Sequence, residues 1–163
     1  MNGAASWSFH EDDARRIDHL LVGFLAEAGA RTAILVDRVG QTLATVGEPP
    51  TFDPVAFASL TAADFSANDQ LARLLGEDEF GALFHQGERE SLYLADVARR
   101  VILVVLFDTR TTVGLVKLRV RPVVRDLDAL FQEMFSREDA RTPLVDSAFL
   151  GDAADEIDKL FGP

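Results

Sequence analysis

The longest apolar run in the chain is VILVVLF, at residues 101–107. Because no polar residue interrupts it, both faces of this segment can be buried, as in a strand at the centre of a sheet. Two shorter strand-like segments precede it, at residues 83–86 and 91–97, and short polar segments separate the three. We therefore predict three consecutive strands, of which the last lies centrally.

The segment before these strands predicts a helix followed by a hairpin. Ser8 and Glu11 have the spacing of a capping box, which predicts a helix start at this point. Apolar residues then recur at helical spacing along one face: Ile17, Leu20, Leu21, Phe24, Leu25 and Ala28. Gly29 is expected to end the helix. Residues 32–36 and 41–46, with turn residues between them, predict the hairpin.

A second helix is predicted from Asp53 to about Leu75, because Asp caps the first amides and Pro54 fits the first turn. One face gathers mostly small side chains: Ser59, Ala63, Ser66, Gln70 and Arg73, flanked by Ala62 and Ala67. An apolar side consists of Leu60, Leu71, Leu74 and Leu75. Small side chains let another backbone approach closely, but they are also ordinary on helix surfaces. Both interpretations stay open at this point.

Residues 113–135 fit two patterns. Residues 116–121 alternate apolar and basic side chains as a strand does, whereas apolar residues recur at helical spacing over the whole segment. The length favours a helix. Pro122 predicts a kink near residues 119–122, since an internal proline removes one hydrogen bond and clashes with the preceding turn.

The chain has 163 residues, which fits a single domain. We place this domain at residues 8–137 and expect an acidic tail at 138–163, with a short amphipathic helix at 152–161. The apolar face of that helix would consist of Ile157, Leu160 and Phe161. Ten residues are too few for an isolated helix to be stable in water, so this piece docks on something or stays loose.

The composition excludes several classes of protein. The formal net charge is −11, so phosphate backbones and anionic membrane surfaces are poor partners. Cysteine is absent, and no apolar window is long enough to span a membrane. We expect a cytoplasmic protein that binds no nucleic acid and inserts into no membrane. Residues 99–125 differ from the rest, with seven basic residues and one acidic, and solvated strand ends and a helix face explain them best.

No motif for catalysis is present. The sequence lacks phosphate-binding loops, dinucleotide fingerprints, zinc-protease motifs and serine nucleophile elbows. The three histidines are far apart in sequence: His10, His19 and His85. We therefore predict no catalytic residues, no metal and no cofactor. The carboxylates at residues 12–13 and 77–79 fit solvated helix and loop charges better than an unfamiliar acidic active site.

Four stretches of the chain resemble the Roadblock/LC7 family, in particular its MglB-type members. They read LVDRVGQTLATVG at 35–47, SLTAADFSANDQLARLLGEDEF at 59–80, FHQGERESLYL at 84–94 and VILVVLFDTRTTVGLVKLR at 101–119, and the likeness resumes at DEIDKLF, 155–161. The resemblance implies an α/β (α+β) domain of Roadblock/LC7 fold. Its five-stranded antiparallel sheet would carry helices on both faces, in the order α-β-β-α-β-β-β-α. It also implies a homodimer whose sheets join edge to edge, with the second helices side by side.

The same resemblance implies a function. MglB-type proteins activate a Ras-like GTPase of the MglA type, which sets cell polarity for motility, so enrichment at a cell pole is expected. Two activator subunits contact one GTPase and reposition its own catalytic groups, without an arginine finger. On this chain the contact surface would consist of Ala63, Ser66, Ala67 and Gln70, with Arg73 at its rim. The C-terminal helix would dock elsewhere on the GTPase and promote nucleotide exchange.

The chain departs from the family pattern at residues 68–70, where Asn, Asp and Gln replace the usual alanine and glycine. Asp69 is expected to be available for a basic residue of the partner. The alternative function is a Roadblock-type scaffold, which binds a GTPase or motor complex without stimulating hydrolysis. The sequence leaves both functions open.

Overall fold

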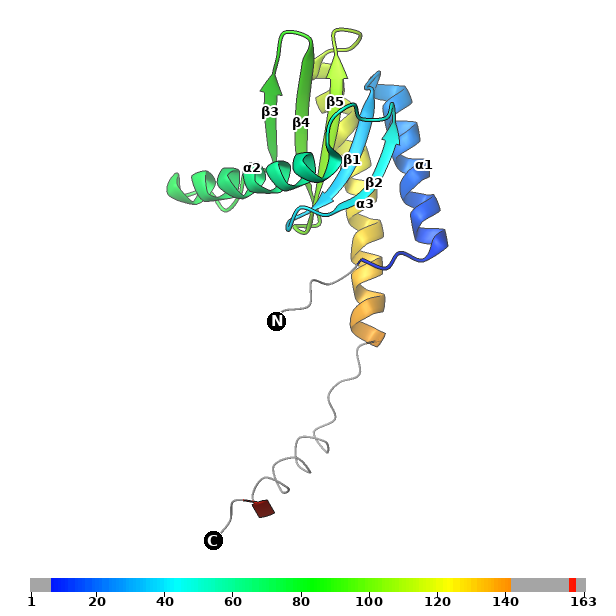
Figure 1. Ribbon diagram of the computed structural model, residues 1–163, viewed down its shortest axis with the longest axis vertical. Coiled ribbons are helices and arrows are strands. Elements are labelled where there is room, and N and C mark those ends of the chain that lie inside the picture. Colours follow the sequence, from blue (N-terminus) through cyan, green and yellow to red (C-terminus); the bar gives the residue numbers. More distant parts are fainter. Residues whose placement is uncertain (1–6, 142–158, 161–163) are drawn as a thin grey trace. The chain divides into compact units, whose positions relative to one another are not determined.

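The computed structural model describes residues 7–141 and 159–160 (Figure 1). Its elements are α1 (Glu11–Ala28), β1 (Thr32–Asp37), β2 (Thr42–Gly47), α2 (Pro54–Leu74), β3 (Ala82–Gln86), β4 (Glu90–Val97), β5 (Val101–Asp108) and α3 (Val113–Arg141). The predicted order of helices and strands is confirmed.

The five strands form one antiparallel sheet in the order β2-β1-β5-β4-β3. The apolar strand β5 lies at the centre, between β1 and β4, as its sequence predicted. Five consecutive residues of β5, Val101 to Val105, are buried, because helices cover both faces of the sheet there. The strands β2 and β3 form the two edges, and α2 crosses the sheet toward β3 and extends past it (Figure 1).

Helices α1 and α3 lie on one face of the sheet, opposite α2 (Figure 1). The predicted apolar stripe of α1 is buried there, apart from Leu20, which is half-buried. Gly29 ends α1 in a left-handed conformation with φ 65°, as predicted. The predicted capping box is wrong, because the residue that precedes α1 is His10 and its side chain makes no capping bond.

Helix α3 continues through Pro122 as far as Arg141, so the helical interpretation is right and the alternating, strand-like one is wrong. The chain divides into two compact units, residues 1–131 and 132–163, and α3 contributes to both. The predicted helix at 152–161 lies outside the described residues, except that 159–160 are helical. The predicted domain limits, 8–137 and 138–163, stay a prediction.

Candidate interaction surface on the second helix

Helix α2 begins with a side-chain cap. The Asp53 carboxylate accepts a hydrogen bond from the Val55 amide at 3.0 Å, and Pro54 occupies the first turn. The predicted start is therefore confirmed. The helix crosses the sheet, and its C-terminal end continues past the edge strand β3 (Figure 1). Phe65 packs on the sheet and Asp69 pairs with Arg38 of the β1–β2 turn, so only the end of the helix after them projects.

The side of α2 that faces the sheet is made mostly of small residues. Its buried positions are Ala58, Thr61, Ala62, Phe65, Asn68 and Ala72. Phe65 is the one large side chain among them, and it packs with Ile34, Val104 and Leu94 of the sheet. Asn68 donates a hydrogen bond to the Phe80 carbonyl at 3.3 Å, so it faces inward and is no part of an outer surface.

The predicted contact residues all lie on the outer surface of α2. Each of the five is exposed: Ala63, Ser66, Ala67, Gln70 and Arg73. We call this set the α2 stripe. Its first four side chains are small or neutral, and Arg73 lies at its C-terminal end. Ala62, predicted as a flanking residue, is instead buried.

Five large apolar side chains of α2 and its end are also exposed. The exposed fractions are 72% for Val55, 70% for Leu60, 56% for Leu71, 82% for Leu74 and 74% for Leu75. Three of these leucines lie on the last turn and a half of the helix, where it projects past β3. Single exposed leucines are common on protein surfaces, but several on one helix end are not, so this end is a candidate contact surface.

Asp69 has a partner within its own chain. Its carboxylate accepts a hydrogen bond from Arg38 at 2.9 Å, so this charge is paired within the chain, and a contact with a basic residue of another protein stays a prediction. Arg38 also pairs with Asp96 at the end of β4. A recess of about 360 Å³ opens beside this pair, and it is lined by Arg38, Ala62, Ser66, Asp69, Arg73, Asp78, Glu79 and Arg99. The recess is thus continuous with the α2 stripe at Ser66 and Arg73.

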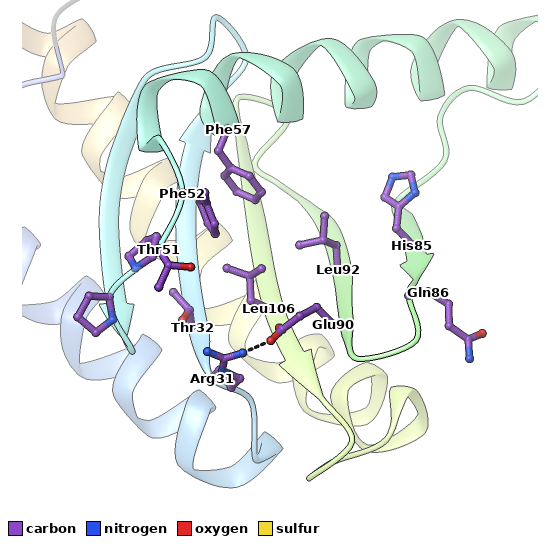
Figure 2. A pocket seen from close by; sticks show the side chains of 13 residues that line it. Arg31, Thr32, Thr51, Phe52, Phe57, His85, Gln86, Glu90, Leu92 and Leu106 are labelled. Carbon is purple, nitrogen blue, oxygen red and sulfur yellow. Dashed lines mark hydrogen bonds and ion pairs between the residues drawn. The ribbon is translucent and has the colours of Figure 1, made fainter.

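A second hollow, of about 480 Å³, lies on the same sheet face where α2 leaves the strands uncovered (Figure 2). Phe57 of α2 and Phe52 point into it together, with ring centroids 4.5 Å apart. Leu92 and Leu106 form its floor. His85 stands at its β3 side and pairs with Asp64 of α2 at 2.6 Å. The sheet surface beside α2 is therefore also lined by apolar side chains.

At the edge of this hollow, where Figure 2 shows Arg31 beside Glu90, two arginines and three carboxylates near strand ends form a cluster. Arg31 pairs with Glu48 at 2.8 Å and also with Glu90, and Arg110 pairs with Glu48 at 3.1 Å and with Asp108 at 3.0 Å. Hydrogen bonds from Arg31 and then Arg110 lower the pKa of Glu48. The hydrogen bond from the Arg110 side chain is the main cause of a lowered pKa at Asp108. The cluster links the strand ends, because its arginines and carboxylates pair with one another.

Within the described residues no three His, Cys, Asp or Glu side chains gather as metal ligands would. In the same part of the chain, no helix combines the length and hydropathy of a membrane span.

Asp13 is buried, so its expected role as a solvated charge is wrong. Sequence reasoning did not predict that Arg38 bonds to α2 or that Phe65 packs α2 on the sheet. The signal for Arg38 was weak, because an arginine in a turn usually points to solvent.

Comparison with known proteins identifies the family of this chain. The family model described as Roadblock/LC7 domain matches residues 16–107. The chain belongs to the Roadblock/LC7 family. A structure of Myxococcus xanthus MglB is 39% identical with a TM-score of 0.69, covering 72% of this chain and 96% of that one. The gliding protein MglB from Thermus thermophilus is 34% identical with a TM-score of 0.73, covering 78% and 97%. No curated protein matches the chain.

Other solved structures agree with this assignment. An MglB described with a tetrameric arrangement is 34% identical, with a TM-score of 0.73, and covers 78% of this chain and 96% of its own. A Roadblock/LC7 domain from Streptomyces avermitilis shares 14% identity at a TM-score of 0.63, which shows the fold alone. The predicted family and its five-stranded architecture are therefore confirmed. For this Roadblock/LC7 chain, the α2 stripe stays a predicted contact surface.

Proposed function

We propose that this Roadblock/LC7 protein is a homodimeric activator of a Ras-like GTPase of the MglA type, and acts in cell polarity and motility. Its 34–39% identity to MglB proteins over most of the chain supports this class of regulator. One of those relatives is described as a gliding protein. The α2 stripe carries the proposal, because a long exposed helix face of small side chains is suited to a close protein contact.

The proposed homodimer uses the projecting end of α2 and the edge strand β3. Strand β3 pairs only with β4 within the described part of the chain, so its other edge is open to a second sheet. Leu71, Leu74 and Leu75 project beyond that edge and are 56–82% exposed. A twofold axis at β3 would bring the leucines of both subunits together and cover them. Two α2 stripes would then lie side by side, and one GTPase would contact both.

The proposed mechanism leaves the chemistry to the GTPase. A GTPase is accelerated either by an arginine inserted in trans or by repositioning its own groups around the attacking water. The centre of the α2 stripe offers Ala63, Ser66 and Ala67, which are too short to reach into a nucleotide site. These side chains instead let the GTPase surface approach the helix backbone closely. Arg73 lies at the edge of the stripe and contributes to binding.

The test is a phosphate-release assay with purified MglA-type GTPase and the Ala63→Arg variant. The long charged side chain would separate the two surfaces, so we expect stimulation of GTP hydrolysis to fall at least about a hundredfold, as for loss of a contact worth several kcal/mol. The matched control is Ala26→Arg, which places the same side chain on an exposed position of α1. Full stimulation by Ala63→Arg would overturn the stripe assignment.

The alternative function, a scaffold without effect on hydrolysis, is separated by the same assay. A scaffold would bind the GTP-loaded GTPase, measured by co-purification with GTP-like and GDP states, and leave the rate of phosphate release unchanged. An activator must bind the GTP state in preference, since equal binding shifts neither state. Wild-type protein that binds without stimulation would thus establish the scaffold.

A second activity is proposed for the C-terminal segment, namely promotion of nucleotide exchange through Ile157, Leu160 and Phe161. Of these residues only Leu160 is described, and it is helical and 74% exposed. Truncation after Arg141 tests the proposal. Exchange should lose its stimulation while GTP hydrolysis remains stimulated, and unchanged exchange would reject it.

A further inference from the structure

Arg38 connects three elements at the place where α2 lies over the sheet. It sits in the turn between β1 and β2, directly after Asp37. One terminal nitrogen donates to Asp69 of α2 at 2.9 Å, and the other donates to Asp96 at the end of β4. The centre of its guanidinium group lies 4.5 Å from the ring centroid of Phe65, also on α2. Both helix contacts are therefore made by one planar group.

The turn that carries Arg38 is itself held firmly. The buried Asp37 carboxylate accepts hydrogen bonds from the amides of Val39 at 3.1 Å and Gln41 at 2.8 Å. Gly40 in the same turn approaches α2 so closely that an added Cβ would lie 3.0 Å from the Cα of Ser59. The turn thus touches α2 near its N-terminal end and, through Arg38, near its middle.

Besides Arg38, two polar contacts hold α2: the Asp64 pair with His85 of β3 at 2.6 Å, and the hydrogen bond from Asn68 to the Phe80 carbonyl at 3.3 Å. Apart from Phe65, the buried side chains are small, and small side chains interlock little with the strands below them. Phe65 and Asp69 are one turn apart, and each directly precedes a residue of the α2 stripe, Ser66 and Gln70. Any roll of the helix about its axis would move the stripe and break the Arg38 contacts together.

We propose that Arg38 is a positioning residue, which fixes the roll of α2 over the sheet and thereby the direction in which the α2 stripe faces. Its side chain and that of Asp69 are about one quarter exposed, at 27% and 28%, so water screens the pair less than a surface pair. The contact with Phe65 adds a cation–π attraction to the same group. The functional consequence rests on the proposed function, whereas the effect on α2 does not.

The primary test is amide hydrogen exchange of the free, full-length protein with the Arg38→Gln variant. We expect the amides of residues 61–72 to exchange about tenfold faster, while those of β5 keep their rates, because a local anchor is lost and the core is not. Asp69→Asn removes only the helix side of the pair and should give a smaller increase. The double variant should match Arg38→Gln, since both changes break one interaction.

Arg99→Gln is the matched control. Arg99 lines the same recess and pairs with Glu79 at 3.7 Å, but it makes no contact with α2 among the hydrogen bonds and ion pairs of the described residues. Its loss should leave α2 exchange unchanged. Asp96 is unsuited to the test, because it also holds the adjacent turn by accepting a hydrogen bond from the Arg99 amide at 3.2 Å.

Three results would overturn the proposal: unchanged α2 exchange in Arg38→Gln, an equal increase in Arg99→Gln, or an equal increase throughout β5 in both Arg38→Gln and Asp69→Asn. The functional arm uses GTP hydrolysis at saturating activator. A misdirected stripe should lower the maximal stimulated rate, and Arg38→Lys, which retains the charge, should restore part of it. If the wild-type protein stimulates no GTPase, the proposed function fails, while the exchange result still tests the role of Arg38.

Discussion

On one face of the sheet α1 buries Ile17, Leu21 and Phe24, whereas on the other face α2 buries mostly small side chains and leaves its leucines exposed to water. Both helices pack on the same sheet, yet the first buries large side chains against it and the second buries mostly small ones. The difference shows that the leucines of α2 do not belong to the core of this chain. They are available for contacts with other molecules.

We call the sheet face covered by α1 and α3 the sealed face, and the face covered by α2 the open face. The first way to test the contrast between them is Leu21→Ala on the sealed face. Leu21 is fully buried, so the free energy of unfolding should fall by about 2–5 kcal/mol, through lost apolar burial and the cavity that remains. Urea denaturation of the full-length protein measures the change. Leu118→Ala on α3 is the control, because that side chain is 60% exposed and should change stability by less than about 0.5 kcal/mol. Equal effects would contradict a sealed face.

Glycines beside the two helices give a second test. An added Cβ at Gly47, where φ is 101°, would lie 2.2 Å from the Arg31 carbonyl oxygen and 2.7 Å from Leu25 of α1. Gly47→Ala should therefore lower the free energy of unfolding by about 2–3 kcal/mol, from backbone strain and overpacking together. Gly76, just after α2, has φ 80° and nothing within 4 Å of an added Cβ. Gly76→Ala should cost only the strain, about 1 kcal/mol. Equal losses in the two variants would show that the sealed face has room to adjust.

The sequence predicted the sealed face more fully than the open one. Helical spacing of large apolar residues identified α1, and an uninterrupted apolar run identified β5, because both patterns follow from burial in the same chain. The direction of α2 could not be predicted, since it depends on Arg38 reaching Asp69 across 31 positions of sequence. No local pattern reports such a pair. Asp69 was predicted as an outer residue for the same reason, although it pairs with Arg38, and Asn68 likewise bonds within the chain.

The open face also holds the ion cluster at the strand ends, and pH tests its contribution. The folded pKa values of Glu48 and Asp108 are lowered, so these groups stabilise the fold above their ordinary pKa values near 4. That stabilisation is lost as pH falls below those ordinary values and through the lowered pKa values of the folded protein. The urea midpoint should drop over this range and drop less in Arg110→Gln. Arg15→Gln, which breaks an exposed pair with Asp12, is the control. An unchanged pH slope in Arg110→Gln would exclude the cluster as the cause.

The smallest expected change in stability, and the sharpest test of the contrast, comes from Leu71→Ala combined with Leu74→Ala on the projecting end of α2. These side chains are 56% and 82% exposed, so their loss removes little apolar burial from the single chain. The unfolding free energy measured at concentrations where the protein is monomeric should change by less than about 0.5 kcal/mol. In the proposed dimer both leucines are buried in each of the two subunits, so the double variant removes four apolar side chains from the interface. The dimer dissociation constant should therefore rise by more than about tenfold.

Sedimentation equilibrium over a range of protein concentrations measures that constant, and Leu118→Ala serves again as the control on the opposite face. A destabilised monomer with an unchanged dimer would mean that the leucines belong to the core of their own chain. Loss of the dimer with an intact monomer would mean that α2 leaves them exposed for a second copy. In that second case the contrast between the two sheet faces would have one physical cause: residues of the same chain pack α1, and residues of a second copy would complete α2.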